Sequence, residues 1–476
     1  MKRVVSMMML LVLLASVLAA CGAPAGETTP SPAGGNTDAS VAPASVAAEP
    51  SAAEESAEPS VAASVEASAE ASEEASAAPS VAASEEATEE AGTSETTTAV
   101  AETLPDVSGL DLGTVKIAVA APLSGPQALF GTTAQNGAQL AIDQIGEQMG
   151  FGDLQLAPFD DQATENVGAS NANQIAADQD IFCVDGHINS GVALAALPTY
   201  QSANLIMISP SNTNPRITDD FDDTAYRLVG RDDVQGVVAA DFAQQQGATS
   251  VYILSDQTAY GDGLASVFRE HATEIGLTEA GFAGTQETTV FDSVLTPIQA
   301  ANPDLVFFGG IYDRAGPLLQ QMRDRGIEAR FLGGDGLDSA DFARLAGDAV
   351  VGANYVTVSG PASSYPQAAQ FAEDYQAAYN TAAGYPAFQS YDAVKGCLLA
   401  IANAAVEANG RPTREQVKAA MQEITTYEGV TGTINFNEEG DRSPATYYIF
   451  EAASGDPEQW SQNSVVSSID AEPPQN

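Results

Sequence analysis

The chain has 476 residues, of which 64 are acidic and 17 are Lys or Arg, so its formal net charge at pH 7 is −47. A surface of that sign repels phosphate backbones and anionic lipids, which excludes nucleic acids and acidic membrane surfaces as partners. The length exceeds what one hydrophobic core usually serves, and we therefore expect more than one lobe in the folded part.

The chain begins with a short apolar segment that ends at a cysteine. Lys2 and Arg3 give a positive start, residues 7–20 are apolar except for one serine, and Cys21 follows two alanines. The apolar run is shorter than the roughly 20 residues that span a bilayer, and the layout is that of a cleavable secretory signal. The small residues before Cys21 resemble a bacterial lipobox. This resemblance implies a signal peptide over residues 1–20, lipidation of Cys21 and an extracytoplasmic location at the cell membrane; an uncleaved anchor is the alternative.

Residues 21–112 are predicted to form a disordered tether. Residues 22–107 consist mainly of Ala, Ser, Glu, Pro, Thr and Val, and they contain no Lys, Arg or aromatic residue. Such a segment cannot bury enough apolar surface to offset the entropy of ordering it. As a flexible coil of roughly 90 residues, it would have a root-mean-square span of about 50 Å.

From residue 114 onward, short apolar runs alternate with amphipathic segments. Strands are predicted at Val115–Ala121, Leu154–Phe159, Ile181–Val184, Leu205–Ser209, Val251–Ser255, Leu305–Gly309, Phe331–Gly333 and Tyr355–Val358. Helices are predicted at Thr133–Gln148, Thr164–Ala177, Val192–Gln201 and Asp313–Arg325. This alternation predicts an α/β fold with parallel sheets that are covered on both faces. Ligands of open α/β sheets bind beyond the carboxyl ends of the strands, so we expect the site there.

Two cysteines remain besides Cys21. Cys183 lies in a predicted strand and Cys397 in an apolar helical run. A disulfide is permitted outside the cytoplasm. The two contexts indicate separate buried positions, however, so we expect two unpaired thiols, with a disulfide as the alternative.

Motifs for catalysis, metals and phosphates are missing from the sequence. There is no phosphate-binding loop, G-x-S-x-G, H-E-x-x-H or C-x-x-C pattern. The only histidines are His187 and His271, which argues against a histidine-based metal site, and we expect His271 to be exposed on a polar helix. The segment from Asp335 to 341 lacks the spacing and closing Glu of a calcium-binding hand loop, and Asp338 or Ser339 is instead predicted to cap a helix. We expect no enzyme activity, no cofactor and no metal.

Seven segments carry a resemblance to a known family. They are Val115–Pro126 with Phe130-Gly131, Gly186–Gly191, Ser209–Pro215, Ser255–Gly263, Phe307–Gly310, Gly333–Gly336 and Ser390–Ala393. In this order they resemble branched-chain amino-acid substrate-binding proteins, which belong to the type I periplasmic-binding-protein family, and the similarity runs from residue 115 to about 450. The resemblance implies two Rossmann-like lobes, joined by three hinge crossovers, that close over a ligand between them.

The resemblance also implies domain boundaries. We place the crossovers near Gly230, Gly360 and Gly432 in a binding domain of residues 113–460, with residues 461–476 as a flexible tail. The first lobe would comprise about residues 113–231 and 361–432, and the second about 232–360 and 433–455.

Two loops are expected to hold an α-amino acid. Asn189 and Ser190 lie where a strand passes into a helix, so the Ser190 hydroxyl and the free N–H groups can hold a carboxylate at the positive end of the helix. Ser211, Asn212 and Thr213 form a second such loop, and the family uses the equivalent positions for both ends of the zwitterion. Ordinary helix capping is the alternative for both loops.

The remaining positions are assigned from the resemblance. Asp335 occupies the position of an acidic partner for the ligand ammonium, which is a Glu in the Leu/Ile/Val-binding protein; alone, it would be read as a turn residue. Tyr260 would close over the ligand from the second lobe, and Phe130 and Phe388 would form an apolar wall. Packing at an edge or in the core is the alternative for these three aromatic residues.

The chain also departs from the family pattern. Ile311 replaces a tyrosine that contacts the ligand in the Leu/Ile/Val-binding protein, with Tyr312 shifted by one. Ala163 and Asn189 stand where that protein has a disulfide. The anchoring of the amino and carboxylate groups is therefore indicated more firmly than the side-chain specificity.

We predict a monomeric, lipid-anchored solute-binding protein that captures an amino acid of the branched-chain type or a related one and delivers it to an ABC permease. One alternative is a binding protein for amides, urea or organic acids that signals to a membrane receptor. The other is an extracytoplasmic enzyme on the same scaffold, which the missing motifs disfavour.

Overall fold

The structure is a computed structural model that describes residues 103–365 and 367–474. The predicted signal peptide, Cys21 and nearly all of the predicted tether lie outside these residues. Within the described part, no helix has both the length and the apolar composition needed to cross a bilayer.

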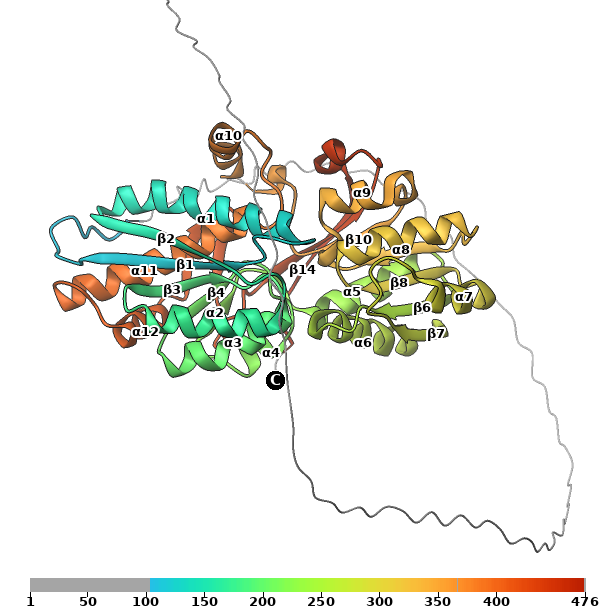
Figure 1. Cartoon of the computed structure of the whole chain (residues 1–476), viewed down its shortest axis with the longest axis horizontal. Coiled ribbons are helices and arrows are strands. Elements are labelled where there is room, and N and C mark those ends of the chain that lie inside the picture. Colours follow the sequence, from blue (N-terminus) through green and yellow to red (C-terminus); the bar gives the residue numbers. More distant parts are fainter. Residues whose placement is uncertain (1–102, 366, 475–476) are drawn as a thin grey trace, which may run out of the picture. The chain divides into compact units, whose positions relative to one another are not determined.

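The first lobe is built on a parallel five-stranded sheet. Its strand order is β2 (Asp153–Asp160), β1 (Thr114–Ala121), β3 (Ile181–Gly186), β4 (Ile206–Ser209) and β5 (Ala225–Arg227). The helices are α1 (Ala128–Met149), α2 (Glu165–Ala177), α3 (Ser190–Ser202), α4 (Arg216–Asp219), α10 (Ala368–Tyr379), α11 (Ala387–Ala408) and α12 (Arg414–Gln422). Side chains alternate along β1, so that Ile117 and Val119 pack in the core with α1 and α11, whereas Ala118 and Ala120 pack with α2 and α3. Figure 1 shows α1 on one side of this sheet and α2 and α3 on the other.

The second lobe is built on a mixed seven-stranded sheet. Its order is β14 (Ser464–Ala471), β13 (Ala445–Glu451), β10 (Asn354–Thr357), β9 (Arg330–Gly333), β8 (Leu305–Gly309), β6 (Ser250–Ser255) and β7 (Thr278–Gly284). Strand β13 runs antiparallel to both of its neighbours, β10 and β14. The helices are α5 (Asp232–Gln245), α6 (Ala259–Glu274), α7 (Asp292–Ala301), α8 (Tyr312–Asp324) and α9 (Ala340–Ala346). Neighbouring residues of β8 face opposite layers: Phe307 stacks on Phe268 of α6 with ring centroids 3.8 Å apart, and Phe308 stacks on Phe331.

Capping side chains define several helix ends. Thr258 accepts a hydrogen bond from the backbone N–H of Gly261 at the start of α6, and Thr413 forms a capping box with Gln416 at the start of α12. Helix α1 is followed by the C-cap Gly150, whose φ of 78° lies in the left-handed region that glycine adopts readily. All eight predicted strands and all four predicted helices are present, and the predicted α/β fold of two lobes is confirmed.

The chain passes between the two sheets three times: after β5 at residues 228–231, between β10 and α10, and after β12 at residues 436–444. We call these the first, second and third crossovers. The first two contain the predicted Gly230 and Gly360. The third lies after the predicted Gly432, because Gly432 starts the second strand of a hairpin of β11 (Thr426–Gly429) and β12 (Gly432–Asn435).

Both predicted ends of the binding domain need correction. The tether does not extend to residue 112, because Val107 and Leu112 are buried in the core and the Val107 N–H donates to the Met149 carbonyl at 2.9 Å. The last residues are not a flexible tail either: β14 pairs with β13 over almost its whole length and completes the hydrogen bonds of that strand. Because β14 is exposed along nearly all of its length, its sequence lacks the apolar alternation that reveals a half-buried strand.

The prediction of two unpaired thiols is wrong. Cys183 of β3 and Cys397 of α11 form a disulfide with their Cα atoms 5.8 Å apart, although 214 residues separate them in sequence. The two cysteines lie in the same hydrophobic core, because α11 lies across the face of the first sheet to which Cys183 points.

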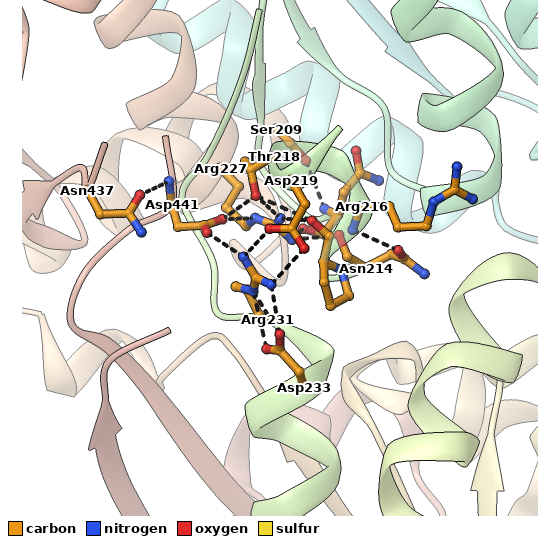
Figure 2. A network of polar contacts seen from close by, with 12 residues as sticks. Ser209, Asn214, Arg216, Thr218, Asp219, Arg227, Arg231, Asp233, Asn437 and Asp441 are labelled. Carbon is orange, nitrogen blue, oxygen red and sulfur yellow. Dashed lines mark hydrogen bonds and ion pairs between the residues drawn. The ribbon is translucent and has the colours of Figure 1, made fainter. Parts of the chain in front are cut away.

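Two buried arginines connect the first crossover to the third (Figure 2). Arg227, at the end of β5, pairs through Nε with Asp441 Oδ1, and Arg231 Nη1 lies 2.8 Å from Asp441 Oδ2. Arg231 also contacts Asp219 and Asp233, each at 2.8 Å. Burial favours the neutral carboxyl of Asp441, but the Arg227 charge and the Arg231 hydrogen bond prevail and hold its pKa below the usual value. We call these five residues the hinge network.

Candidate ligand-binding site

A small cavity lies where the carboxyl ends of strands from both sheets meet. It is lined by Phe130, Ile188, Asn189, Ser190, Ser211, Thr213 and Tyr385 of the first lobe, and by Tyr260, Ile311, Asp335 and Gly336 of the second. The space open to the centre of a water molecule is about 20 Å³. This corresponds to about one water molecule, so a larger ligand can enter only if the lobes separate and wall side chains move.

The polar wall of the first lobe is built from the two loops that follow β3 and β4. Ser190 is the first residue of α3, so its hydroxyl and the free N–H groups of that helix end lie at the cavity. The Ser209 hydroxyl accepts the Asn212 N–H at 2.8 Å, and Asn212 Nδ2 donates to the Ile188 carbonyl at 2.9 Å. These bonds hold the two loops together. The Asn189 Oδ1 atom is buried and has no hydrogen-bond partner among the described residues.

The second lobe contributes a buried acid. Asp335 follows β9 and is only 4% exposed. Its Oδ1 accepts hydrogen bonds from the Tyr260 hydroxyl at 2.8 Å and from Gln235 Nε2 at 2.9 Å, and its Oδ2 accepts one from the Tyr385 hydroxyl at 3.3 Å. Burial raises the pKa of Asp335, and the hydrogen bonds from Gln235 and Tyr260 oppose this rise. Among the described residues, Asp335 forms no ion pair.

A second buried acid interacts electrostatically with the first. Asp232 opens α5, and its carboxyl is fully buried. Burial raises its pKa well above the usual value, and the negative charge of Asp335 raises it further. A cation bound beside Asp335 would offset the negative charge that raises the pKa of Asp232.

Contacts across the cleft show that the lobes are closed. The Tyr312 hydroxyl of the second lobe donates to the Pro126 carbonyl of the first at 3.1 Å, and Asn214 Nδ2 donates to the Ala259 carbonyl at 2.9 Å. Tyr385 connects the lobes at the cavity itself, because its hydroxyl lies 2.8 Å from the Ser211 hydroxyl and also donates to Asp335.

The apolar wall is mainly aromatic. The Phe130 ring meets the rings of Tyr312 and Tyr385 edge to face, with centroids 4.9 and 5.6 Å away. Ile188 and Ile311 complete this wall. Ile311 therefore faces the cavity, whereas Tyr312 closes the cleft beside it.

Most of the predicted ligand-binding residues come together at this cavity. Those that line it are Ser190, Asn189, Ser211, Thr213, Asp335, Tyr260, Phe130 and Ile311. Asn212 lies behind the wall and braces it. Phe388 does not line this cavity; it packs against Phe371 at 4.8 Å and lines a neighbouring cavity instead.

Sequence reasoning missed Tyr385, Gln235 and Asp232. Tyr385 comes five residues before the matched segment at 390–393, where nothing local distinguishes it from a core aromatic residue. Gln235 and Asp232 lie on α5, and only the fold brings that helix to the end of β9.

The histidines and the predicted cap lie outside the cavity. His187 is fully buried and contacts Asp161 at 2.8 Å and the Tyr200 hydroxyl at 3.0 Å. The expectation of an exposed His271 is wrong, because its side chain is only 21% exposed and contacts Asp241 at 2.8 Å. Of the two residues predicted to cap a helix, Asp338 and Ser339, it is Ser339 that forms the N-cap of α9. Within the described residues, no three His, Cys, Asp or Glu side chains are placed to hold a metal ion.

The sequence of this chain is similar to a known protein family and to characterised proteins. A family model described as periplasmic binding protein matches residues 114–457. A Leu/Ile/Val-binding protein homolog of Brucella suis is 31% identical over 345 residues, which cover 72% of this chain and 91% of that protein. A leucine-, isoleucine-, valine-, threonine- and alanine-binding protein of Pseudomonas aeruginosa is 29% identical, with 71% and 90% covered.

A similar solved structure is that of the branched-chain amino-acid transporter substrate-binding protein of Streptococcus pneumoniae in complex with isoleucine. Its TM-score is 0.66 at 25% identity, and the match covers 76% of this chain and 100% of that one.

Proposed function

This chain belongs to the periplasmic binding protein family, and from that membership and the buried Asp335 we propose that it captures an amino acid outside the cytoplasm and delivers it to an ABC importer. The names of the relatives support an amino acid of the branched-chain type or a related one. The lipobox-like segment supports anchoring through Cys21. We propose that the anchored protein acts as a monomer.

The observation that carries the proposal is the environment of Asp335. It is a buried acid whose described partners are all neutral donors, in a cavity closed by both lobes. A zwitterion that leaves water keeps its ammonium charged only if a partner replaces the lost hydration, and Asp335 supplies that partner. We assign the ligand carboxylate to Ser190 with the N–H groups of α3, and to the 211–213 loop.

The assigned mechanism is binding and closure, with the ligand left unchanged. The ligand first contacts one lobe, and closure then brings Asp335 and Tyr260 of the second lobe against Ser211 and Tyr385 of the first. Because these contacts form only on closure, a permease can recognise the loaded protein by its closed form. Co-purification with a permease, rather than with a kinase or chemoreceptor, would favour import over sensing.

Calorimetry of the ligand-stripped protein tests the proposal. L-leucine, L-isoleucine, L-valine and L-alanine are titrated against 4-methylpentanoate, which is leucine without its amino group. Binding of an amino acid with at least tenfold preference over 4-methylpentanoate is expected. Equal binding of the acid, or binding of amides only, would refute the ammonium assignment.

Asp335→Asn keeps the side-chain shape and removes the charge. Loss of one partner of a buried charged pair costs about 2–5 kcal/mol, or roughly 30- to several-thousand-fold in affinity. Asp338→Asn, three residues further on, is the matched control and should change amino-acid affinity little. Similar affinities in the two variants would overturn the assignment.

A further inference from the structure

A second and larger cavity adjoins the ligand-binding site. Its volume is about 520 Å³, which lies in the range of small-molecule sites, and it shares Phe130 and Tyr385 with the first cavity. Its walls come from both lobes: Tyr375 and Phe388 belong to the first, and Trp460 to the second. The proposed amino-acid site does not use this space.

The lining of the second cavity combines aromatic rings with acidic groups. The rings are those of Phe130, Tyr355, Tyr375, Tyr385, Phe388, Phe450 and Trp460. The charged side chains among its described lining residues are Asp338 and Glu458, and none of those residues is Lys, Arg or His. Such a surface disfavours anions.

Asp338 is one of the two acidic residues that line this cavity. Its Oδ1 accepts the Trp460 indole N–H at 3.1 Å, and its Oδ2 accepts the Thr357 hydroxyl at 3.0 Å. Both donors are neutral, and Asp338 forms no ion pair with another described residue. Burial raises the pKa of Asp338 to about 6, so at neutral pH the side chain is mostly ionised and lacks a compensating cation.

We propose that this second cavity binds an organic amine, with its cationic nitrogen at Asp338 and its apolar body among the aromatic rings. Aromatic faces attract cations, and a carboxylate at one end fixes the position of the charge. A neutral apolar molecule would fill the same space but leave Asp338 uncompensated. A divalent metal ion is a poorer match, since it prefers six or more oxygen ligands.

The test uses the full-length chain and phenethylamine as the probe. Trp460 is the only tryptophan of the chain, so its fluorescence reports directly on the cavity, and calorimetry gives an independent affinity. Two molecules of similar shape serve as comparators: 2-phenylethanol, which is neutral, and 3-phenylpropionate, which is an anion. Saturable binding of the amine is expected, at least tenfold tighter than the alcohol, with no binding of the acid.

Asp338→Asn should weaken amine binding at least tenfold and leave the melting temperature within a few degrees of the parent protein. Asp335→Asn should change amine affinity by no more than about threefold. Each variant should therefore weaken binding at one of the two cavities only. Equal affinities for amine and alcohol, unchanged amine binding in Asp338→Asn, or simple competition between phenethylamine and an amino acid would each overturn the proposal. The comparison of the amine with the alcohol and the acid does not depend on whether the first cavity binds an amino acid.

Discussion

Reducing the Cys183–Cys397 disulfide should destabilise the first lobe strongly. The bond closes a loop of 214 residues. In the chain-entropy description, closing a loop of this length lowers the conformational entropy of the unfolded chain and so stabilises the folded state by about 5 kcal/mol. The measured stabilisation by a disulfide is typically about 2–4 kcal/mol. Both cysteines are fully buried, so reduction also leaves two thiols in a packed core.

The expected effect can be measured by urea unfolding with and without dithiothreitol. Unfolding a lobe of this size gives a slope of about 3 kcal/mol per molar urea, so reduction should lower the midpoint by roughly 1 M. Peptide mapping by mass spectrometry should find residues 183 and 397 in one cross-linked peptide before reduction and in separate peptides afterwards.

The double variant Cys183→Ala/Cys397→Ala is the control, because dithiothreitol should not shift its midpoint. If mapping shows that the parent protein is fully reduced and its midpoint is unchanged, the loop-closure reasoning is refuted. If mapping finds free thiols in the unreduced protein, the pairing itself is refuted.

Three further predictions concern single side chains. Tyr385→Phe removes the hydroxyl between Ser211 and Asp335, so calorimetry should show amino-acid affinity reduced about tenfold, or ~1.4 kcal/mol; parent-like affinity would contradict the bridge. The pKa of Asp338 is raised to about 6, so between pH 4 and 6 the folded state binds more protons than the unfolded state. The unfolding free energy of the parent protein should therefore fall as pH rises through that window, by on the order of 2 kcal/mol relative to Asp338→Asn. Parallel curves of unfolding free energy against pH for the two proteins would contradict this. Cys21→Ser should move the protein out of the membrane fraction or leave it unprocessed, and normal anchoring would exclude lipidation at this residue.

Much of the fold could be predicted because local periodicity reports on burial. Runs such as Leu305–Gly309 are apolar throughout, as expected of strands covered on both faces, and all five residues of that strand are buried. The site loops were predictable for a related reason. Polar residues such as Ser190 and Asp335 come directly after buried strands, and parallel topology brings those ends together.

The errors have a common cause in long-range geometry. The pairing of Cys183 with Cys397 depends on where α11 crosses the first sheet, which neither local sequence reveals. Only the resemblance places Phe388 on the ligand wall; in the structure it lies in the first turn of α11 and packs against Phe371. Tyr385 lies only three residues earlier, before the helix begins, and lines the cavity.

The three crossovers make each lobe discontinuous along the chain. The first lobe needs α11 and α12 from residues 387–422, and the second needs β13 and β14 from residues 445–471. The hinge network likewise joins Asp219 and Arg231 to Asp441. A nascent chain that stops near residue 440 therefore lacks parts of the second sheet and the shared partner of both arginines. The first lobe is incomplete until α12 has been made, and the second until β14 has been made. Neither lobe should therefore become stable until nearly the whole chain is available.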